Sequence, residues 1–264
     1  MSSGAPVTTA LVGGVARVTL NRPDKRNALD RATISALGAA LQQCAGDPAV
    51  RIVELTGAGE IFCAGADLSE MQAQDQASHA ENLAHAETLA SLLGLLDSLA
   101  KPTLARVNGD GYGGALGLLG ACDIVVAVDT AKFAFTEVRL GIIPAVVSPF
   151  VLGKIGESAA RRYFLSGETM SSATLKDIGL VHDVVPADEL DARCAAIIDA
   201  LLKGAPQAQG HAKALIYDVA HGASQERAAA SVAMAARLAH LRVADEAREG
   251  FSAFFAKRKP NWRQ

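Results

Sequence analysis

Several features that mark whole classes of proteins are scarce in this sequence of 264 residues. Only 5% of the residues are aromatic, and Asp and Glu (28) outnumber Lys and Arg (25), for a formal net charge of −3. A nucleic-acid-binding surface needs clustered positive charge or stacked aromatic side chains, and this composition favours neither. Any anionic ligand must therefore be held by a few local groups.

Cysteine is also sparse and scattered. The sequence has no CxxC pair and no histidine at metal-binding spacing from its four cysteines, which are Cys44, Cys63, Cys122 and Cys194. A disulfide framework or a zinc site would need closer, patterned spacing. We therefore predict free, buried thiols in a reducing compartment, and no metal.

Long apolar runs are missing as well. No uncharged run reaches the ~18 residues that a membrane-spanning helix needs. The opening residues, MSSGAPVTTALVGG, lack the basic stretch and apolar core of a secretory signal. These absences predict a cytoplasmic protein without membrane contact. Hydrophobic residues make up 50% of the chain and charged residues 20%, which is typical of a globular domain.

Strand-like and helix-like segments alternate along the first two thirds of the chain. A helix is predicted where Ile34, Leu37, Leu41 and Cys44 fall at helical spacing before Gly46-Asp47-Pro48. Short apolar runs between turn residues predict strands over residues 15–20, 52–55, 103–107 and 124–128, and a very short fifth strand around Phe133 and Phe135. Such alternation predicts an α/β fold.

The pattern changes after Pro186. Residues 189–257 show only helical periodicity, interrupted at Gly204-Ala205-Pro206 and at His221-Gly222. The last helix carries an apolar stripe formed by Ala247, Phe251, Phe254 and Phe255. This stripe needs a partner surface, which could be the core, another subunit or a ligand. We predict an α/β core over residues 1–204 and a helical C-terminal region over residues 205–264.

Two glycine-rich turns stand out. The turn over residues 108–114 has the bare spacing of a dinucleotide-binding loop but lacks the downstream acidic residue. In the turn over residues 62–68, small residues let a ligand approach the main chain, and Asp67 with Glu70 resembles a capping box that starts a helix. Two such turns can aim two N–H groups at one developing oxyanion, or the glycines can simply permit tight turns.

Five segments are specific when taken in their order: LNRPDKRNALD (20–30), FCAGADL (62–68), VNGDGYGG (107–114) followed by CDIVVA (122–127), FTEVRLGIIP (135–144) and FFAKRKPNW (254–262). Together they resemble the crotonase (enoyl-CoA hydratase/isomerase) superfamily over nearly the whole chain. The resemblance implies an α/β spiral of repeated ββα units, with a helical C-terminal extension that forms trimers and covers coenzyme A. It also implies a homotrimer or a dimer of trimers.

The resemblance implies roles for individual residues. The main-chain N–H groups of Ala66 and Gly114 would form an oxyanion hole, and Glu137, on a strand, would move the proton beside the thioester. Contacts to the acyl-CoA substrate would come from a larger set: Arg26, Ala28, Ala64, Gly65, Asp67, Leu68, Tyr112, Phe254 and Lys257. No separate cofactor is implied, because coenzyme A arrives as part of the substrate.

The surroundings of Glu137 suit this role. Four apolar residues are close to it in the sequence: Phe133, Phe135, Val138 and Leu140. Burial among such residues would raise the pKa of the carboxyl toward the range useful for a proton shuttle. The alternative is that Glu137 only pairs with Arg139 on the same face of the strand.

Two positions depart from the family pattern. Typical hydratases of the crotonase family carry a second glutamate where Gly117 stands, and the family usually has a glycine where Ala145 stands. A single carboxylate suits a Δ3,Δ2-enoyl-CoA isomerase, which moves one proton between two carbons. Residues 136–168, however, most resemble hydratases of branched, glutaconyl-type esters, whose extra carboxylate could meet Arg106, Arg139 or Lys154. We favour the hydratase; a non-catalytic or RNA-binding protein of the same fold is a remote alternative.

Overall fold

The structure is a computed structural model that describes residues 4–67, 69–70, 72, 78–221 and 244–263. The chain forms two compact units. One comprises residues 1–99 and 103–196, and the other comprises residues 100–102 and 197–264.

The first unit is built on a six-stranded sheet with the strand order β1-β2-β3-β4-β6-β9. Only the β1–β2 pair is antiparallel, and every other pair is parallel. All residues of β3 are buried, which is typical of a parallel sheet covered on both faces. The strands are β1 (Val7–Val12), β2 (Val15–Leu20), β3 (Ile52–Gly57), β4 (Thr103–Val107), β6 (Ile124–Val128) and β9 (Asp183–Val185).

A smaller sheet of three strands has the order β5-β7-β8, formed by β5 (Gly111–Tyr112), β7 (Lys132–Ala134) and β8 (Met170–Ser171). The segments β4–β5–α4 and β6–β7–α5 repeat one pattern. Each sends a strand to the large sheet, a strand to the small sheet, and then a helix, α4 (Gly114–Ala121) or α5 (Ser148–Ser166). The predicted α/β class with repeated ββα units is confirmed.

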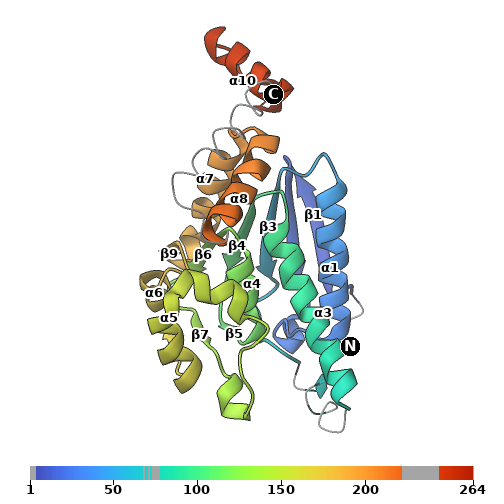
Figure 1. Ribbon diagram of the computed structural model, residues 1–264, viewed down its shortest axis with the longest axis vertical. Coiled ribbons are helices and arrows are strands. Elements are labelled where there is room, and N and C mark those ends of the chain that lie inside the picture. The colour runs from blue at the N-terminus through green and yellow to red at the C-terminus, as the bar shows by residue number, and fades with distance from the viewer. Residues whose placement is uncertain (1–3, 68, 71, 73–77, 222–243, 264) are drawn as a thin grey trace. The chain divides into compact units, whose positions relative to one another are not determined.

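Three helices lie in a row over the large sheet: α1 (Arg31–Gly46), α3 (His79–Ser98) and α4 (Figure 1). The side chain of Asp30 accepts a hydrogen bond from the N–H of Thr33 and so fixes the start of α1. Ser78 and Glu81 form a complete capping box at the start of α3. The apolar spacing that predicted α1 is confirmed, since Ile34, Leu37, Leu41 and Cys44 are all buried.

The predicted strands 15–20, 103–107 and 124–128 match β2, β4 and β6, and β3 extends the prediction of 52–55 by two residues. The short strand β7 ends at Ala134, so Phe135 lies outside it. Several elements were not predicted from the sequence, among them β1, α3, α5, α6 (Ser172–Asp177) and β9.

All four cysteines are free and buried, as predicted. No helix in the described part of the chain combines the length and the apolarity needed to cross a membrane.

The second unit is helical. It contains the end of α7 (Leu190–Leu202), together with α8 (Pro206–His221) and α10 (Asp245–Phe255). The predicted break at residues 204–206 separates α7 from α8. The carboxylate of Glu246 accepts hydrogen bonds from the N–H groups of Gln207 and Ala208, and so joins α10 to the start of α8. On α10, Phe251 is 45% exposed and Phe255 76% exposed.

Candidate active site

Two glycine-rich turns lie against each other in the first unit. The N–H of Cys63 donates to the carbonyl of Asp110 (3.1 Å), and the N–H of Tyr112 donates to the carbonyl of Cys63 (3.1 Å). The segment before α1 joins them, because the N–H of Leu29 donates to the carbonyl of Gly65 (2.7 Å). Three segments that are far apart in the sequence therefore meet at one place.

Gly65 makes this close approach possible. Its φ is +83°, and a Cβ at this position would lie 2.5 Å from the carbonyl oxygen of Tyr112 and 3.6 Å from the main-chain nitrogen of Gly114. No other residue type fits here without a shift of the main chain. The first turn therefore presses against the start of α4, which brings residue 66 close to Gly114.

The two predicted oxyanion donors are available to a ligand. In the described part of the chain, no acceptor takes the N–H of Ala66 or Gly114. Ala66 is exposed and Gly114 is half-buried. The preceding N–H, that of Gly113, donates a hydrogen bond to the carbonyl of Ala134 (3.0 Å) and is not available to a ligand. Because Gly114 begins α4, its N–H has no partner within the helix and lies at the positive end of the helix dipole.

The carboxyl of Glu137 lies next to this turn. Its Oε1 is 3.5 Å from where a Cβ of Gly113 would be. Its Oε2 is buried without a hydrogen-bond partner. Burial raises the pKa of Glu137, and a hydrogen bond from its own N–H only partly opposes this. A half-buried carboxyl that has one oxygen without a partner and is more basic than usual is suited to accept and return a proton.

The predicted strand around Glu137 is wrong. Glu137 begins a 3₁₀ helix, η2 (Glu137–Leu140), because Thr136 has already turned to helical dihedral angles. Gly141, with φ at +74°, ends η2 by donating its N–H to the carbonyls of Glu137 and Val138. The pairing of Glu137 with Arg139 is not observed: Arg139 is exposed, and its side chain lies against Gly167 instead.

The position of the second glutamate of similar hydratases has no room for one here. A Cβ at Gly117 would lie 2.6 Å from Cγ1 of Val147 and 2.9 Å from Cδ1 of Leu93. Valine and leucine side chains thus fill the space where a second carboxylate would extend. The side chains that a Cβ at Gly117 would meet are both apolar.

The residues predicted to contact coenzyme A fall into two groups. The first group lies around the two turns and comprises Arg26, Ala64 and Tyr112. The N–H of Ala64 donates to the carbonyl of Arg26 (2.9 Å). The positive charge of Arg26 is close enough to the Tyr112 hydroxyl to lower its pKa slightly. Burial and a hydrogen bond to Asp110 raise the pKa of that hydroxyl. Ala28 and Gly65 are buried.

The side chain of Asp67 is engaged within the protein, and its predicted contact with coenzyme A stays a prediction. Its carboxylate pairs with Arg22 (3.0 Å) and caps the N–H of Ser69 (2.9 Å). Burial opposes its charge, but these partners outweigh burial and lower the pKa of Asp67. The helix start predicted here is present, yet Glu70 does not complete a capping box, since its carboxylate accepts the N–H of Arg31 instead.

For three further residues predicted to contact coenzyme A, the structure does not place the side chain at the two turns. Leu68 lies outside the described residues, and so does the side chain of Phe254. Lys257 is an exposed residue with φ at +51° after α10, in the second unit. Their part in binding stays a prediction.

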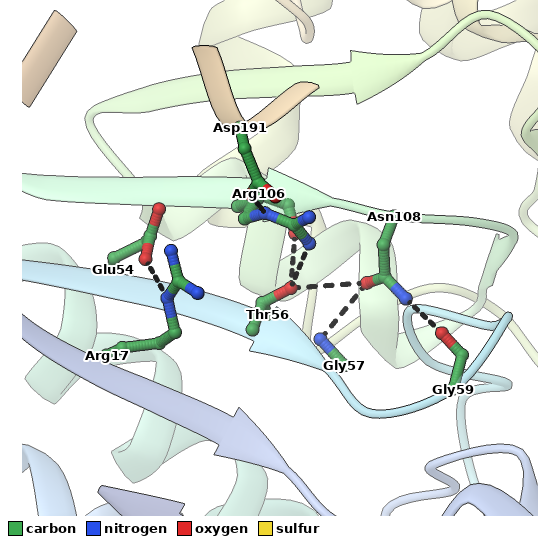
Figure 2. Close-up of polar contacts among 8 residues, drawn as sticks. All are labelled: Arg17, Glu54, Thr56, Gly57, Gly59, Arg106, Asn108 and Asp191. Atoms are coloured by element: carbon green, nitrogen blue, oxygen red, sulfur yellow. Dashed lines mark hydrogen bonds and ion pairs between the residues drawn. The ribbon is translucent and has the colours of Figure 1, made fainter. Parts of the chain in front are cut away.

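Two asparagines that the sequence analysis did not single out hold the turns in place. The buried amide of Asn27 donates to the carbonyls of Ala58 (2.9 Å) and Ile61 (2.7 Å). The amide of Asn108 donates to the carbonyl of Gly59 (2.7 Å) and accepts from Thr56 and Gly57 (Figure 2). Both asparagines stand inside the quoted motifs, and Asn108 is followed directly by a glycine.

Two of the three basic residues considered for a substrate carboxylate are already engaged. Arg106 pairs with Asp191 (2.7 Å), at the start of α7, and also contacts Thr56 (Figure 2). Lys154 donates to the carbonyls of Leu119 and Cys122, at the end of α4. Both side chains are thus held by partners within the protein.

The thiol at the site is not a nucleophile. Burial raises the pKa of Cys63 to about 12, and its sulfur lies 3.5 Å from the N–H of Gly65.

Comparison with known proteins identifies the family. Residues 11–264 match the family model described as enoyl-CoA hydratase/isomerase. The 2,3-dehydroadipyl-CoA hydratase of Escherichia coli K12 is 34% identical, over 93% of this chain and 94% of its own length. The mevalonyl-coenzyme A hydratase of Aspergillus fumigatus is also 34% identical, over 93% and 90%.

A solved structure agrees with these matches. The crystal structure of an enoyl-CoA hydratase from Shewanella pealeana is 39% identical, covers 97% of this chain and 96% of its own, and superposes with a TM-score of 0.93. The similarity thus extends over both the sequence and the fold. This chain belongs to the enoyl-CoA hydratase/isomerase family of enzymes.

Proposed function

We propose that this enzyme adds water across the 2,3 double bond of an unsaturated acyl-CoA. The observation that carries the proposal is the carboxyl of Glu137: its Oε2 is buried without a partner and its pKa is raised, beside the turn that bears the open N–H of Gly114. Coenzyme A enters as part of the substrate, and Arg26 and Tyr112, which lie around the two turns, are proposed to contact it.

In the proposed reaction, the thioester oxygen accepts hydrogen bonds from the N–H groups of Ala66 and Gly114. Glu137 takes a proton from water as the water oxygen bonds to C3. The electrons of the double bond move toward the thioester and form an enolate, whose negative oxygen the two N–H groups stabilise. Glu137 then delivers its proton to C2, which restores the carboxylate.

One carboxyl is sufficient in this scheme because it acts twice. Since Val147 and Leu93 occupy the space over Gly117, no second carboxylate supports the addition from that side. The same observation favours the second candidate, a Δ3,Δ2-enoyl-CoA isomerase, in which Glu137 moves one proton between C2 and C4. The names of the relatives favour hydration.

The acyl group is the less defined part of the proposal. The two hydratases compared above are named for dehydroadipyl and mevalonyl groups, which both carry oxygen beyond the thioester. Residues 136–168 resemble hydratases of glutaconyl-type esters, which also carry a further carboxylate. We propose an oxygen-bearing acyl group of this kind.

The test is a panel of CoA esters followed by absorbance of the conjugated double bond. Hydration of a 2-enoyl-CoA removes this absorbance, and isomerisation of a 3-enoyl-CoA creates it. The panel includes crotonyl-CoA and 3-methylglutaconyl-CoA. If no 2-enoyl ester loses absorbance while a 3-enoyl ester gains it, the enzyme is an isomerase and the hydratase proposal is wrong.

We also propose a homotrimer or a dimer of trimers. The resemblance suggests this assembly, and the exposed Phe251 and Phe255 on α10 are consistent with a subunit contact. Light scattering coupled to size-exclusion chromatography measures the mass directly, and a monomer at micromolar concentration would refute the assembly.

A further inference from the structure

His85 is a polar residue that neither the fold nor the proposed reaction uses. It lies in the second turn of α3, whose start is fixed by the Ser78–Glu81 capping box. Its Nδ1 is buried and has no hydrogen-bond partner. Buried polar atoms in proteins nearly always have one, and leaving one unpaired costs stability. The side chain as a whole is only half-buried, so a ligand that lies beside it can supply the missing partner.

The face of α3 that bears His85 lines the candidate site. His85, Leu89 and Leu93 follow one another at intervals of four residues and so share a face. Cδ2 of Leu89 is 3.8 Å from where a Cβ of Gly114 would be, and Cδ1 of Leu93 is 2.9 Å from where a Cβ of Gly117 would be. This face therefore runs along α4, its neighbour in Figure 1, directly past the open N–H of Gly114.

The side chains that already fill the space beside α4 limit the direction in which a bound acyl chain can extend. With its carbonyl at Gly114, the chain cannot continue along α4, because Leu93 and Val147 close the space at Gly117. The other direction along the same face passes Leu89 and reaches His85. Side chains on a helix lean toward its N-terminus, so His85 extends farther from the reacting carbons than Leu89 does.

We propose that His85 is a specificity-determining residue that donates a hydrogen bond from Nδ1 to an oxygen atom of the acyl chain, several carbons beyond the double bond. The ligand chemistry is an enoyl-CoA whose acyl group ends in a carboxylate or a hydroxyl. The side chains around this route, those of Leu29, Leu89 and Leu93, are aliphatic and offer the oxygen no other partner. The proposal rests on the proposed acyl-CoA function.

The test compares three six-carbon 2-enoyl-CoA esters: plain hexenoyl-CoA, the 6-hydroxy ester and the 6-carboxylate ester, dehydroadipyl-CoA. In the wild-type enzyme, kcat/KM is expected to be higher for at least one oxygen-bearing ester than for hexenoyl-CoA. His85→Leu is expected to lower kcat/KM about 10- to 100-fold for a preferred carboxylate ester and about 2- to 10-fold for a preferred hydroxyl ester. The loss falls on KM, and hexenoyl-CoA is turned over as before.

Two further variants separate recognition from folding. His85→Asn keeps an N–H donor near the position of Nδ1 and is expected to retain most of the preference. His79→Leu changes an exposed histidine on the same helix and leaves all three rates unchanged. If His85→Leu does not fold, His85→Phe replaces it, with a ring of similar size and no donor.

Three results would overturn the inference: a wild-type preference for hexenoyl-CoA, an unchanged preference in the folded His85 variant, or an equal loss on all three esters. The last would show a merely structural role. Failure of the wild-type enzyme to hydrate any of the three esters, or crotonyl-CoA, would refute the proposed function instead.

Discussion

Replacement of Glu137 by glutamine separates catalysis from stability, because the structure predicts that the two change in opposite directions. Glutamine has the same shape as glutamate but cannot accept and return a proton. General acid–base catalysis by one group contributes about 10²–10⁴ in rate, and Glu137 is proposed to act in both proton transfers. We therefore expect Glu137→Gln to lower kcat by about 10⁴ while Kd for the acyl-CoA stays within about twofold.

The same change is expected to stabilise the fold at neutral pH. Oε2 of Glu137 is buried without a partner, and only a hydrogen bond from the residue's own N–H to the carboxyl partly compensates its charge. A buried acceptor left unsatisfied costs about 1–3 kcal/mol, and more when it is charged. An uncharged amide removes part of this cost, on the order of 1 kcal/mol, which for a chain of this size raises Tm by about 2–4 °C.

The pH dependence gives the sign of this effect. Burial raises the pKa of Glu137 above its ordinary value of 4.5. The favourable contribution of the protonated group is complete below 4.5, and it is lost as the pH rises through the raised pKa. The stability advantage of Glu137→Gln should therefore be largest at neutral pH and disappear near pH 4.

Urea unfolding at a series of pH values measures the stability, and isothermal titration with a saturated acyl-CoA measures binding. Glu157→Gln, on the exposed surface of α5, is the matched control for loss of one carboxylate. Near-wild-type turnover in Glu137→Gln would refute the catalytic assignment. A variant that is less stable than wild type at pH 7 would refute the account of an unpaired buried carboxylate.

The remaining predictions concern the turns and α4. Gly65→Ala places a Cβ 2.5 Å from a carbonyl oxygen at φ +83°, so kcat should fall at least about 10²-fold as an oxyanion donor is displaced. Asp67→Asn weakens the ion pair with Arg22, and the free energy of unfolding should fall by about 1.5 kcal/mol, with a smaller loss at pH 3. Gly117→Glu should cost about 1–3 kcal/mol by overpacking and should not raise hydration activity.

Steady-state kinetics and urea unfolding check all three. Gly94→Ala is the control for Gly65→Ala: nothing lies within 4 Å of its new Cβ in α3, so it should keep full activity and gain up to about 1 kcal/mol of stability. A fully active Gly65→Ala would show that the turn is not packed as described. If the free energy of unfolding of Asp67→Asn equals that of the wild type, the ion pair with Arg22 does not stabilise the fold. If Gly117→Glu hydrates the substrate faster than the wild type, the site has room for a second carboxylate.

Local patterns in the sequence were sufficient for much of the fold. The helical spacing of Ile34, Leu37 and Leu41 predicted α1, and short apolar runs predicted β2, β4 and β6 within a residue. The helix α3 was missed because its apolar residues are concentrated in its second half, while its first half is largely exposed.

The sequence by itself determined the class of the fold, the family and the two turns, because periodicity and ordered motifs are properties of neighbouring residues. Only the tertiary structure decided what each side chain meets. Glu137 proved to lie on a 3₁₀ helix beside Gly113, and Asp67 to pair with Arg22, 45 residues away. Whether a carboxylate is unpaired or an N–H is open depends on atoms brought together from distant segments, and no local pattern records those contacts.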